Sequence, residues 1–282
     1  MSEHEQDMSP TSIGGGRYAS KPDEHAAALD PETRAALVAY LLPWADDELI
    51  LGHRDSEWTG VAPQLEEDVA FSSIAQDEIG HAALIYSIVA ALSGDDADRL
   101  ALRRPAEEYR HVALVERSNG DWAFTIARHL FYDLADGYRT DILGDSAYAP
   151  LAGAARKMAR EEHYHVMHDE AWWERLSGGT TESRDRLIAA TWAALPLVVD
   201  VFGETPNEDT LVAAGIVPCP ARALLEEWRL RVRPLLRGLD PTLLPMIEAE
   251  PRPRKARPLD ADFHALHSEM TIVSASGLGD KW

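Results

Sequence analysis

The chain has 282 residues and a formal net charge of −21, from 27 basic and 48 acidic residues. An acidic surface of this kind repels phosphate backbones, which argues against nucleic-acid binding. A hydrophobic fraction of 45% predicts a sizeable buried core rather than general disorder, and the length fits one large helical domain with appendages.

The single cysteine, Cys219, excludes an intramolecular disulfide and a thiolate metal cluster. Any metal site must therefore use oxygen and nitrogen ligands. The first residues are polar and do not resemble a signal peptide, and the sequence lacks a run of about 18 apolar residues. We therefore expect a cytoplasmic protein that does not span a membrane.

Helical patterns dominate the chain after a polar start, and strand signals are nearly absent. Residues 1–28 are expected to form a disordered tail. Pro43 is expected to kink the first helix and Pro196 to disturb the fifth. In chain order, the predicted helices cover about residues 30–57, 63–92, 119–143, 146–176, 181–202, 220–236 and 260–273.

Four long helices followed by shorter ones predict an all-α protein built on a four-helix bundle with additional C-terminal helices. We assign the bundle domain to residues 29–250, and a C-terminal linker with a short helix to residues 251–282. A solenoid of helical repeats is the alternative architecture, but the sequence shows no self-similarity of that kind.

Two Glu-x-x-His pairs, Glu78–His81 and Glu162–His165, carry the chemistry that the sequence suggests. Positions i and i+3 share one face of a helix, so each pair can offer a carboxylate and an imidazole to one metal. For either pair alone, a solvated helix face is the better interpretation. Both pairs, however, interrupt an otherwise apolar stripe, where an unpaired carboxylate is costly to bury and needs a metal, a cation or a proton.

The other two long helices each supply a carboxylate within an apolar stripe, Glu48 and Asp133. Glu48 precedes Glu78 by 30 residues, and Asp133 precedes Glu162 by 29. Two such hairpins packed together give four carboxylates and two imidazoles, the ligand set of ferritin-like di-iron carboxylate proteins. We therefore predict a site for two Fe ions, with Mn or Zn as alternatives, in a ferritin-like bundle.

Some neighbouring residues compete for these roles or support them. Asp47 and Glu57 compete with Glu48, and Asp136 lies one turn after Asp133. Asp77 and Glu161 directly precede the two glutamates of the Glu-x-x-His pairs, and we expect them to hydrogen-bond the outer nitrogens of the imidazoles. His163 and His168 lie near the second pair, and we expect them on other faces of the helix.

The C-terminal linker contains a basic cluster formed by Arg252, Arg254, Lys255 and Arg257. Such a cluster can meet a CoA phosphate or the acidic surface of a partner. An ordinary solvated linker is the simpler interpretation, and we adopt it as the expectation.

Several segments resemble the phenylacetyl-CoA epoxidase family of ferritin-like subunits. The first set comprises Asp47–Arg54, Ser56-Glu57-Trp58, Ala62-Pro63 and Ile74–His81. The second comprises Trp173–Leu176, Gly178-Gly179-Thr180, Glu182-Ser183, Glu269-Met270 and Trp282. The similarity covers about residues 32–282 and is best for the C-type subunit. It implies a multicomponent monooxygenase that uses O₂ and electrons from a reductase to epoxidise the ring of phenylacetyl-CoA.

The resemblance also implies partners and exposes one departure. A C-type subunit pairs with the catalytic A-type subunit, so we expect a homo- or hetero-oligomer and a CoA-thioester substrate. Familiar C-type subunits have lost part of the ligand set and are regarded as structural. Here every ligand position of the A-type subunit is matched, by Glu48, Glu78, His81, Asp133, Glu162 and His165.

Three hypotheses about function therefore stay open at this point. The chain is an oxygenase component with an intact di-iron site, a non-catalytic subunit that stabilises its A-type partner, or a stand-alone ferritin-like di-iron oxidase or oxygenase.

Overall fold

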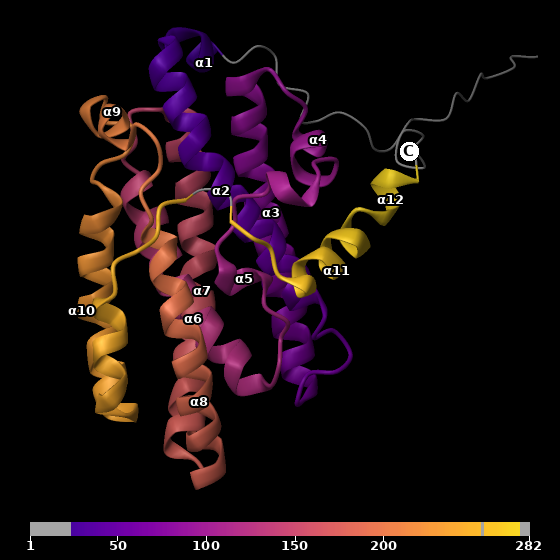
Figure 1. Ribbon diagram of the computed structural model, residues 1–282, viewed down its shortest axis with the longest axis vertical. Helices are drawn as coiled ribbons and strands as arrows, with labels where there is room; N and C mark the ends of the chain where they lie inside the picture. Colours follow the sequence, from indigo (N-terminus) through magenta and orange to yellow (C-terminus); the bar gives the residue numbers. More distant parts are fainter. Residues whose placement is uncertain (1–23, 255–256, 277–282) are drawn as a thin grey trace, which may run out of the picture.

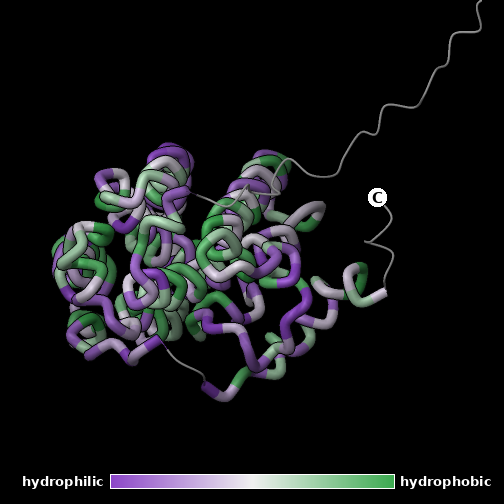
Figure 2. Tube along the Cα trace, turned by 90° about the horizontal axis from the view of Figure 1, so that it is seen from above, coloured by the Kyte–Doolittle hydropathy of each residue, from purple (hydrophilic) through white to green (hydrophobic). Residues whose placement is uncertain are grey.

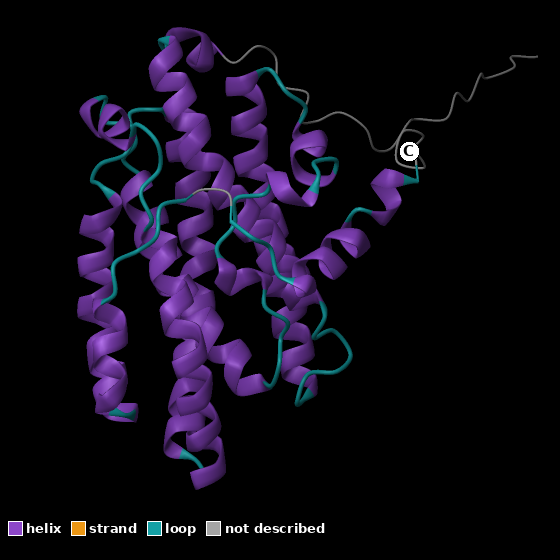
Figure 3. Ribbon diagram, in the orientation of Figure 1, coloured by secondary structure: helices purple, strands orange, loops and turns teal. Residues whose placement is uncertain are grey.

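The computed structural model describes residues 24–254 and 257–276, and within these ranges it contains helices and loops but no strand (Figures 1 and 3). Four long helices form the bundle: α2 (Pro31–Ser56), α3 (Leu65–Ser93), α6 (Trp122–Leu143) and α7 (Ala149–Gly178). Helix α2 packs along α3, α6 packs along α7, and α3 contacts α7. The predicted all-α, ferritin-like bundle is thereby confirmed.

The ends of the long helices follow from local sequence chemistry. Asp30 caps α2, because one oxygen of its carboxylate accepts hydrogen bonds from two backbone N–H groups of the first turn, both at 3.0 Å. Pro31 occupies the first turn, where its missing N–H costs nothing. Asp121 caps α6 by accepting one hydrogen bond from the backbone N–H of Phe124 at 3.0 Å. Helix α3 ends at Gly94, whose φ of 76° is a left-handed conformation that glycine adopts readily.

The helices that follow the bundle agree with the prediction in position. Helix α8 (Thr181–Val198) continues past Pro196 and tightens into the 3₁₀ turn η2 (Val199–Phe202), and α10 is Ala221–Leu239. Helix α2 runs through Pro43 without a break. After residue 28, the prediction missed five short elements: α4 (Ala97–Leu102), η1 (Ala106–Glu108), α5 (Ala113–Glu116), α9 (Glu208–Ala213) and η3 (Pro241–Glu248).

The predicted N-terminal tail, residues 1–28, needs a correction at its end. Residues 1–23 lie outside the part of the chain that the structure describes. The last five residues, Glu24–Ala28, form helix α1 rather than a disordered segment. The physical reason is that Ala26 is 5% exposed and packs into the main hydrophobic core, so this turn is held by tertiary contact.

The C-terminal linker is not the solvated segment that the sequence suggested. The Arg254 guanidinium lies 2.8 Å from a carboxylate oxygen of Asp47 in α2. Arg257 meets Glu116 at 2.8 Å, and Arg252 meets Asp200 at 2.7 Å. The linker is thus tied to the bundle by carboxylates that are themselves largely buried. Lys255 lies outside the described residues.

Beyond the linker, α11 (Ala261–Met270) contacts η1, and α12 (Ile272–Ala275) follows it at the edge of the molecule (Figure 1). Phe263 and Leu266 anchor α11 in the hydrophobic core. Seen from above, the helices carry hydrophobic and hydrophilic residues side by side (Figure 2). None of the helices in the described ranges has the length and apolar character needed to cross a membrane.

Gly52 sets the distance between α2 and α3. A Cβ atom at this position would lie 2.8 Å from Ile79 Cγ1 and 3.0 Å from Glu78 Cβ. We expect Gly52→Ala to lower the free energy of unfolding by about 1–3 kcal/mol, because the two helices must separate to admit the methyl group. Urea denaturation measures the effect. The matched control is Gly80→Ala, where a Cβ meets nothing within 4 Å; an equal loss there would refute the close-packing argument.

Candidate metal centre

The four bundle helices bring the six predicted ligands to one buried place. Each of the six is at most 2% exposed. They form two groups that share Glu162, and within each group one potential ligand atom per residue lies within 4.8 Å of the others. The first group is Glu48, Glu78, His81 and Glu162, and the second is Asp133, Glu162 and His165.

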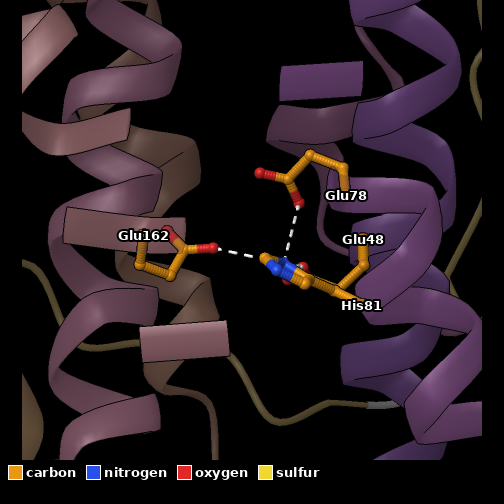
Figure 4. A group of neighbouring side chains, drawn as sticks. All are labelled: Glu48, Glu78, His81 and Glu162. Carbon is orange, nitrogen blue, oxygen red and sulfur yellow. Dashed lines mark hydrogen bonds and ion pairs between the residues drawn. The ribbon is translucent and has the colours of Figure 1, made fainter. Parts of the chain in front are cut away.

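Figure 4 shows how the first group is assembled. Glu162 reaches across from α7 toward the three residues of α2 and α3. His81 Nδ1 faces the centre, 3.2 Å from Glu48 Oε2 and 3.3 Å from Glu162 Oε1. In the second group, His165 Nδ1 lies 3.4 Å from Glu78 Oε1. Both imidazoles therefore present the same ring nitrogen to the carboxylates.

The outer nitrogens of these imidazoles are held across the two hairpins. His81 Nε2 lies 2.9 Å from Glu161 of α7, and His165 Nε2 lies 3.5 Å from Asp77 of α3. A carboxylate of α7 thus orients the imidazole of α3, and a carboxylate of α3 orients the imidazole of α7. The hydrogen bonds expected for Asp77 and Glu161 are present, and such outer partners fix the tautomer and orientation of a ligating histidine.

Glu48 is fixed by two donors on one of its oxygens. Tyr132 Oη donates to Glu48 Oε1 at 2.8 Å, and Trp44 Nε1 donates to the same atom at 3.0 Å. The second oxygen, Oε2, is left facing His81. A carboxylate held in this way offers one oxygen in a defined direction, which suits a terminal ligand.

Several polar atoms at the centre are buried without a hydrogen-bond partner among the described residues. They are both carboxylate oxygens of Glu78 and of Glu162, Oδ1 of Asp133 and Nδ1 of His165. A buried polar atom without a partner is costly, so a concentration of such atoms marks a place where an ion could bind. A metal ion satisfies this donor set, since carboxylate oxygen and imidazole nitrogen are ligands for iron and manganese.

The ionisation of the cluster reflects the same crowding. Burial, and then the neighbouring carboxylates of Glu48 and Glu162, raise the pKa of Glu78 well above its usual value. Burial opposes the charged form of His81, but the adjacent carboxylates of Glu162 and Glu48 outweigh it and raise its pKa to about 11. Burial raises the pKa of Asp133 to about 7, although His129 offsets part of the effect.

The competing carboxylates are engaged elsewhere. Asp47 pairs with Arg254, and Glu57 pairs with Arg54 at 2.7 Å. Asp136 pairs with Arg139 at 2.8 Å. None of the three belongs to either group, so the geometry favours Glu48 and Asp133 over their competitors.

A third group was not foreseen from the sequence. His129, Asp133 and Asp169 are fully buried, with one ligand atom each within 4.8 Å of the others. The available signal was spacing, since His129 lies four residues before Asp133. His168 was expected on another face, but it is partly buried and bonds to Asp169 at 3.2 Å and to Glu67 at 2.7 Å. His163 is exposed, as expected.

A cleft of about 630 Å³ opens beside the cluster, and Asp133 and Glu162 form part of its lining. Gly137 lies on α6 within this lining, and Arg160 and Arg231 contribute positive charge to it. The candidate centre is thus buried on the side of α2 and α3, while its α6 and α7 side adjoins a cleft large enough for a small organic group.

Comparisons with known proteins give the family of the chain. Residues 20–282 match the family described as "Phenylacetic acid catabolic protein". The chain is 34% identical over 197 residues to the C-type subunit of the 1,2-phenylacetyl-CoA epoxidase of Escherichia coli (strain K12), and the match covers 70% of this chain and 79% of the relative. The resemblance inferred from the sequence is confirmed, and the chain belongs to the phenylacetic acid catabolic protein family.

Proposed function

We propose that this protein is a subunit of a multicomponent oxygenase that epoxidises the ring of phenylacetyl-CoA, and that it binds a pair of metal ions itself. The Escherichia coli relative supports the substrate and the subunit character. The observation that carries the metal proposal is the set of buried carboxylate and imidazole atoms without hydrogen-bond partners among the described residues.

The distances suggest which residue serves which ion. The oxygens of Glu78 face different histidines, with Oε2 4.0 Å from His81 Nδ1 and Oε1 3.4 Å from His165 Nδ1. Glu162 Oε1 lies between the same nitrogens, at 3.3 and 3.7 Å. Glu78 and Glu162, which lie near both histidines, would therefore contribute to holding both ions. Glu48 with His81, and Asp133 with His165, would hold one ion each.

Two iron ions held by these residues would supply activation of O₂ for transfer of one oxygen atom to the ring, with electrons from a reductase. The chain's own residues position and shield this chemistry. Glu48 and the histidines are oriented by hydrogen bonds, and the buried α2–α3 side excludes water. The cleft beside Asp133 and Glu162 can admit a thioester, and Arg160 can attract the phosphates of CoA, whereas Arg231 is paired with Glu170.

The proposal includes partners that the resemblance implies. A catalytic A-type subunit and a reductase complete the enzyme, so the working form is a hetero-oligomer. Manganese in place of iron, the cytoplasmic location and the domain boundaries stay predictions.

Metal counting tests the proposal. After anaerobic reconstitution with Fe(II), we expect about two iron ions per chain by elemental analysis, and a large loss in Glu162→Ala because that residue belongs to both groups. The control is Glu174→Ala, an exposed glutamate on the same helix, which should keep both ions. If the wild-type protein binds well under one iron ion per chain, the metal proposal is wrong.

That outcome would instead favour a non-catalytic subunit that stabilises its A-type partner. One observation gives this second candidate weight. Burial opposes the charged forms of His81 and His165, but the surrounding carboxylates outweigh it and raise their pKa values to about 11 and about 9. Both side chains can therefore be imidazolium ions, which balance part of the negative charge of the cluster. Protons alone can then hold the cluster together.

A further inference from the structure

A third group of potential metal ligands lies beside the proposed metal pair. We propose that His129 Nδ1, Asp133 and Asp169 bind one divalent transition-metal ion. The site shares Asp133 with the pair, so the inference rests on the proposed function and deepens it. It nevertheless has two residues, His129 and Asp169, that the pair does not use.

The geometry fits one ion. All three side chains are fully buried, and one ligand atom from each lies within 4.8 Å of the other two. An ion with bonds of about 2.0–2.2 Å holds its ligand atoms within about 4.4 Å of one another, so small side-chain adjustments close the site. His129 precedes Asp133 by four residues, and Asp169 follows His165 by four. The third position is therefore about one helical turn along the bundle from the second.

His129 repeats the arrangement of the two histidines in the pair. Its Nε2 lies 2.6 Å from Asp55, and its Nδ1 points toward Asp133, 3.4 Å from Oδ2. His81 and His165 likewise turn Nδ1 inward and bind an outer carboxylate through Nε2. A histidine that ligates a metal usually donates its other N–H to a carboxylate in this way. Three buried imidazoles in one bundle thus share the geometry of metal ligands.

Unsatisfied oxygens face the same place. Asp133 Oδ1 and Asp169 Oδ2 are buried and have no hydrogen-bond partner among the described residues. The other oxygen of Asp169 meets His168 Nδ1 at 3.2 Å, but Nε2 of that imidazole also serves Glu67 at 2.7 Å. Two carboxylates therefore share one imidazole, and the two buried oxygens without partners are the atoms that a bound cation would satisfy.

The donor set indicates the class of ion. Two carboxylates and one imidazole suit Fe(II), Mn(II) or Zn(II), whereas Cu(I) prefers sulfur ligands that this place lacks. The Phe71 ring covers the site, with its centroid 5.3 Å from that of His129 and 5.6 Å from that of His168. An apolar cover limits water and strengthens binding to charged ligands.

Zinc loading with crystallography tests the site without any reading of activity. We expect about three zinc ions per wild-type chain, and about two in both Asp169→Asn and His129→Gln. Anomalous density is expected within about 2.2 Å of His129 Nδ1 in the wild type. The buried control is Asp136→Asn, on the same helix as His129 but paired with Arg139, which should keep all three ions.

The outcomes separate this site from the metal pair. If the wild type and Asp169→Asn both bind about two ions, the third site is wrong and the pair stands. If the wild type binds one ion that is lost in Asp169→Asn and kept in Glu78→Gln, the third site stands and the pair fails. An absence of bound zinc overturns both. Should either variant fail to fold, the anomalous density at His129 in the wild type decides alone.

Discussion

Glu78→Gln is expected to abolish binding of the metal pair and, in the same protein, to raise the stability of the metal-free form. Burial and the carboxylates of Glu48 and Glu162 hold the pKa of Glu78 well above its usual value. Folding without metal at neutral pH must therefore bury a repelled charge or take up a proton. Glutamine keeps the shape and removes this cost. We expect a gain of about 0.5–2 kcal/mol in the free energy of unfolding.

The pH dependence gives the prediction a sign that can be checked. A carboxyl whose folded pKa is raised costs nothing below its unfolded pKa of 4.5, and its cost grows as the pH rises toward the folded pKa. The difference in stability between Glu78→Gln and wild type should therefore be small near pH 4 and widen toward neutral pH. Urea denaturation with a chelator present, repeated across this range, measures it.

Adding metal should reverse the ranking. An ion at 100 times its dissociation constant stabilises the folded wild type by about 2.7 kcal/mol, and the variant should gain little. The control is Glu66→Gln, an exposed glutamate on the same helix, which should behave as wild type throughout. The argument is wrong if Glu78→Gln is the less stable protein in chelator at neutral pH, or if it still binds two ions.

The long helices and the centre of the site could be predicted because their signals are local. Asp30 and Pro31 mark the start of α2 by their own chemistry. Glu78 and Glu162 stand out because each places a charge on an otherwise apolar helix face. The nearly equal spacings within the two hairpins, 30 and 29 residues, predict that the four carboxylates lie at the same level of the bundle. The sequence could also nominate Asp77 and Glu161, although it held no sign that each would bind the imidazole of the opposite hairpin.

The short helices and the linker depend on contacts that are distant along the chain. Helices α4 and α5 are too short for a periodic pattern, and their buried leucines, Leu100 and Leu114, gain order only from packing. Arg254 looked like a solvated linker residue because its partner, Asp47, lies 207 positions away. The composition of a basic, proline-rich segment cannot predict a contact with a residue so distant in the sequence.

His129 could not be predicted from the Glu-x-x-His pattern for a different reason. It belongs instead to a His-x-x-x-Asp pair on α6. Its face was recognisable, because four residues bring it in line with Asp133. Its other partner, Asp55, comes from the end of α2. A rule that flags every histidine in line with a predicted ligand would have found the third group.

Asp46→Ala is expected to be among the most destabilising single substitutions in this chain. Asp46 is fully buried, and its carboxylate accepts hydrogen bonds from Tyr86 Oη at 2.5 Å, from the backbone N–H of Arg110 at 2.7 Å and from the guanidinium of Arg104. Burial alone lowers the pKa of Arg104, but the charge of Asp46 outweighs burial and raises it. Alanine leaves a buried guanidinium uncompensated, which costs about 3–5 kcal/mol.

Two further variants show whether the charge or the contact carries this effect. Asp46→Asn keeps one acceptor but loses the charge, so we expect a smaller loss that still exceeds about 1 kcal/mol. Asp95→Ala removes an exposed pair with Arg99 and should cost at most about 1 kcal/mol. Chemical denaturation with metal-free protein measures all three. An Asp46→Ala loss no larger than that of Asp95→Ala would mean that Arg104 finds water when its partner is gone, and that the loop between α4 and α5 is not held by this carboxylate.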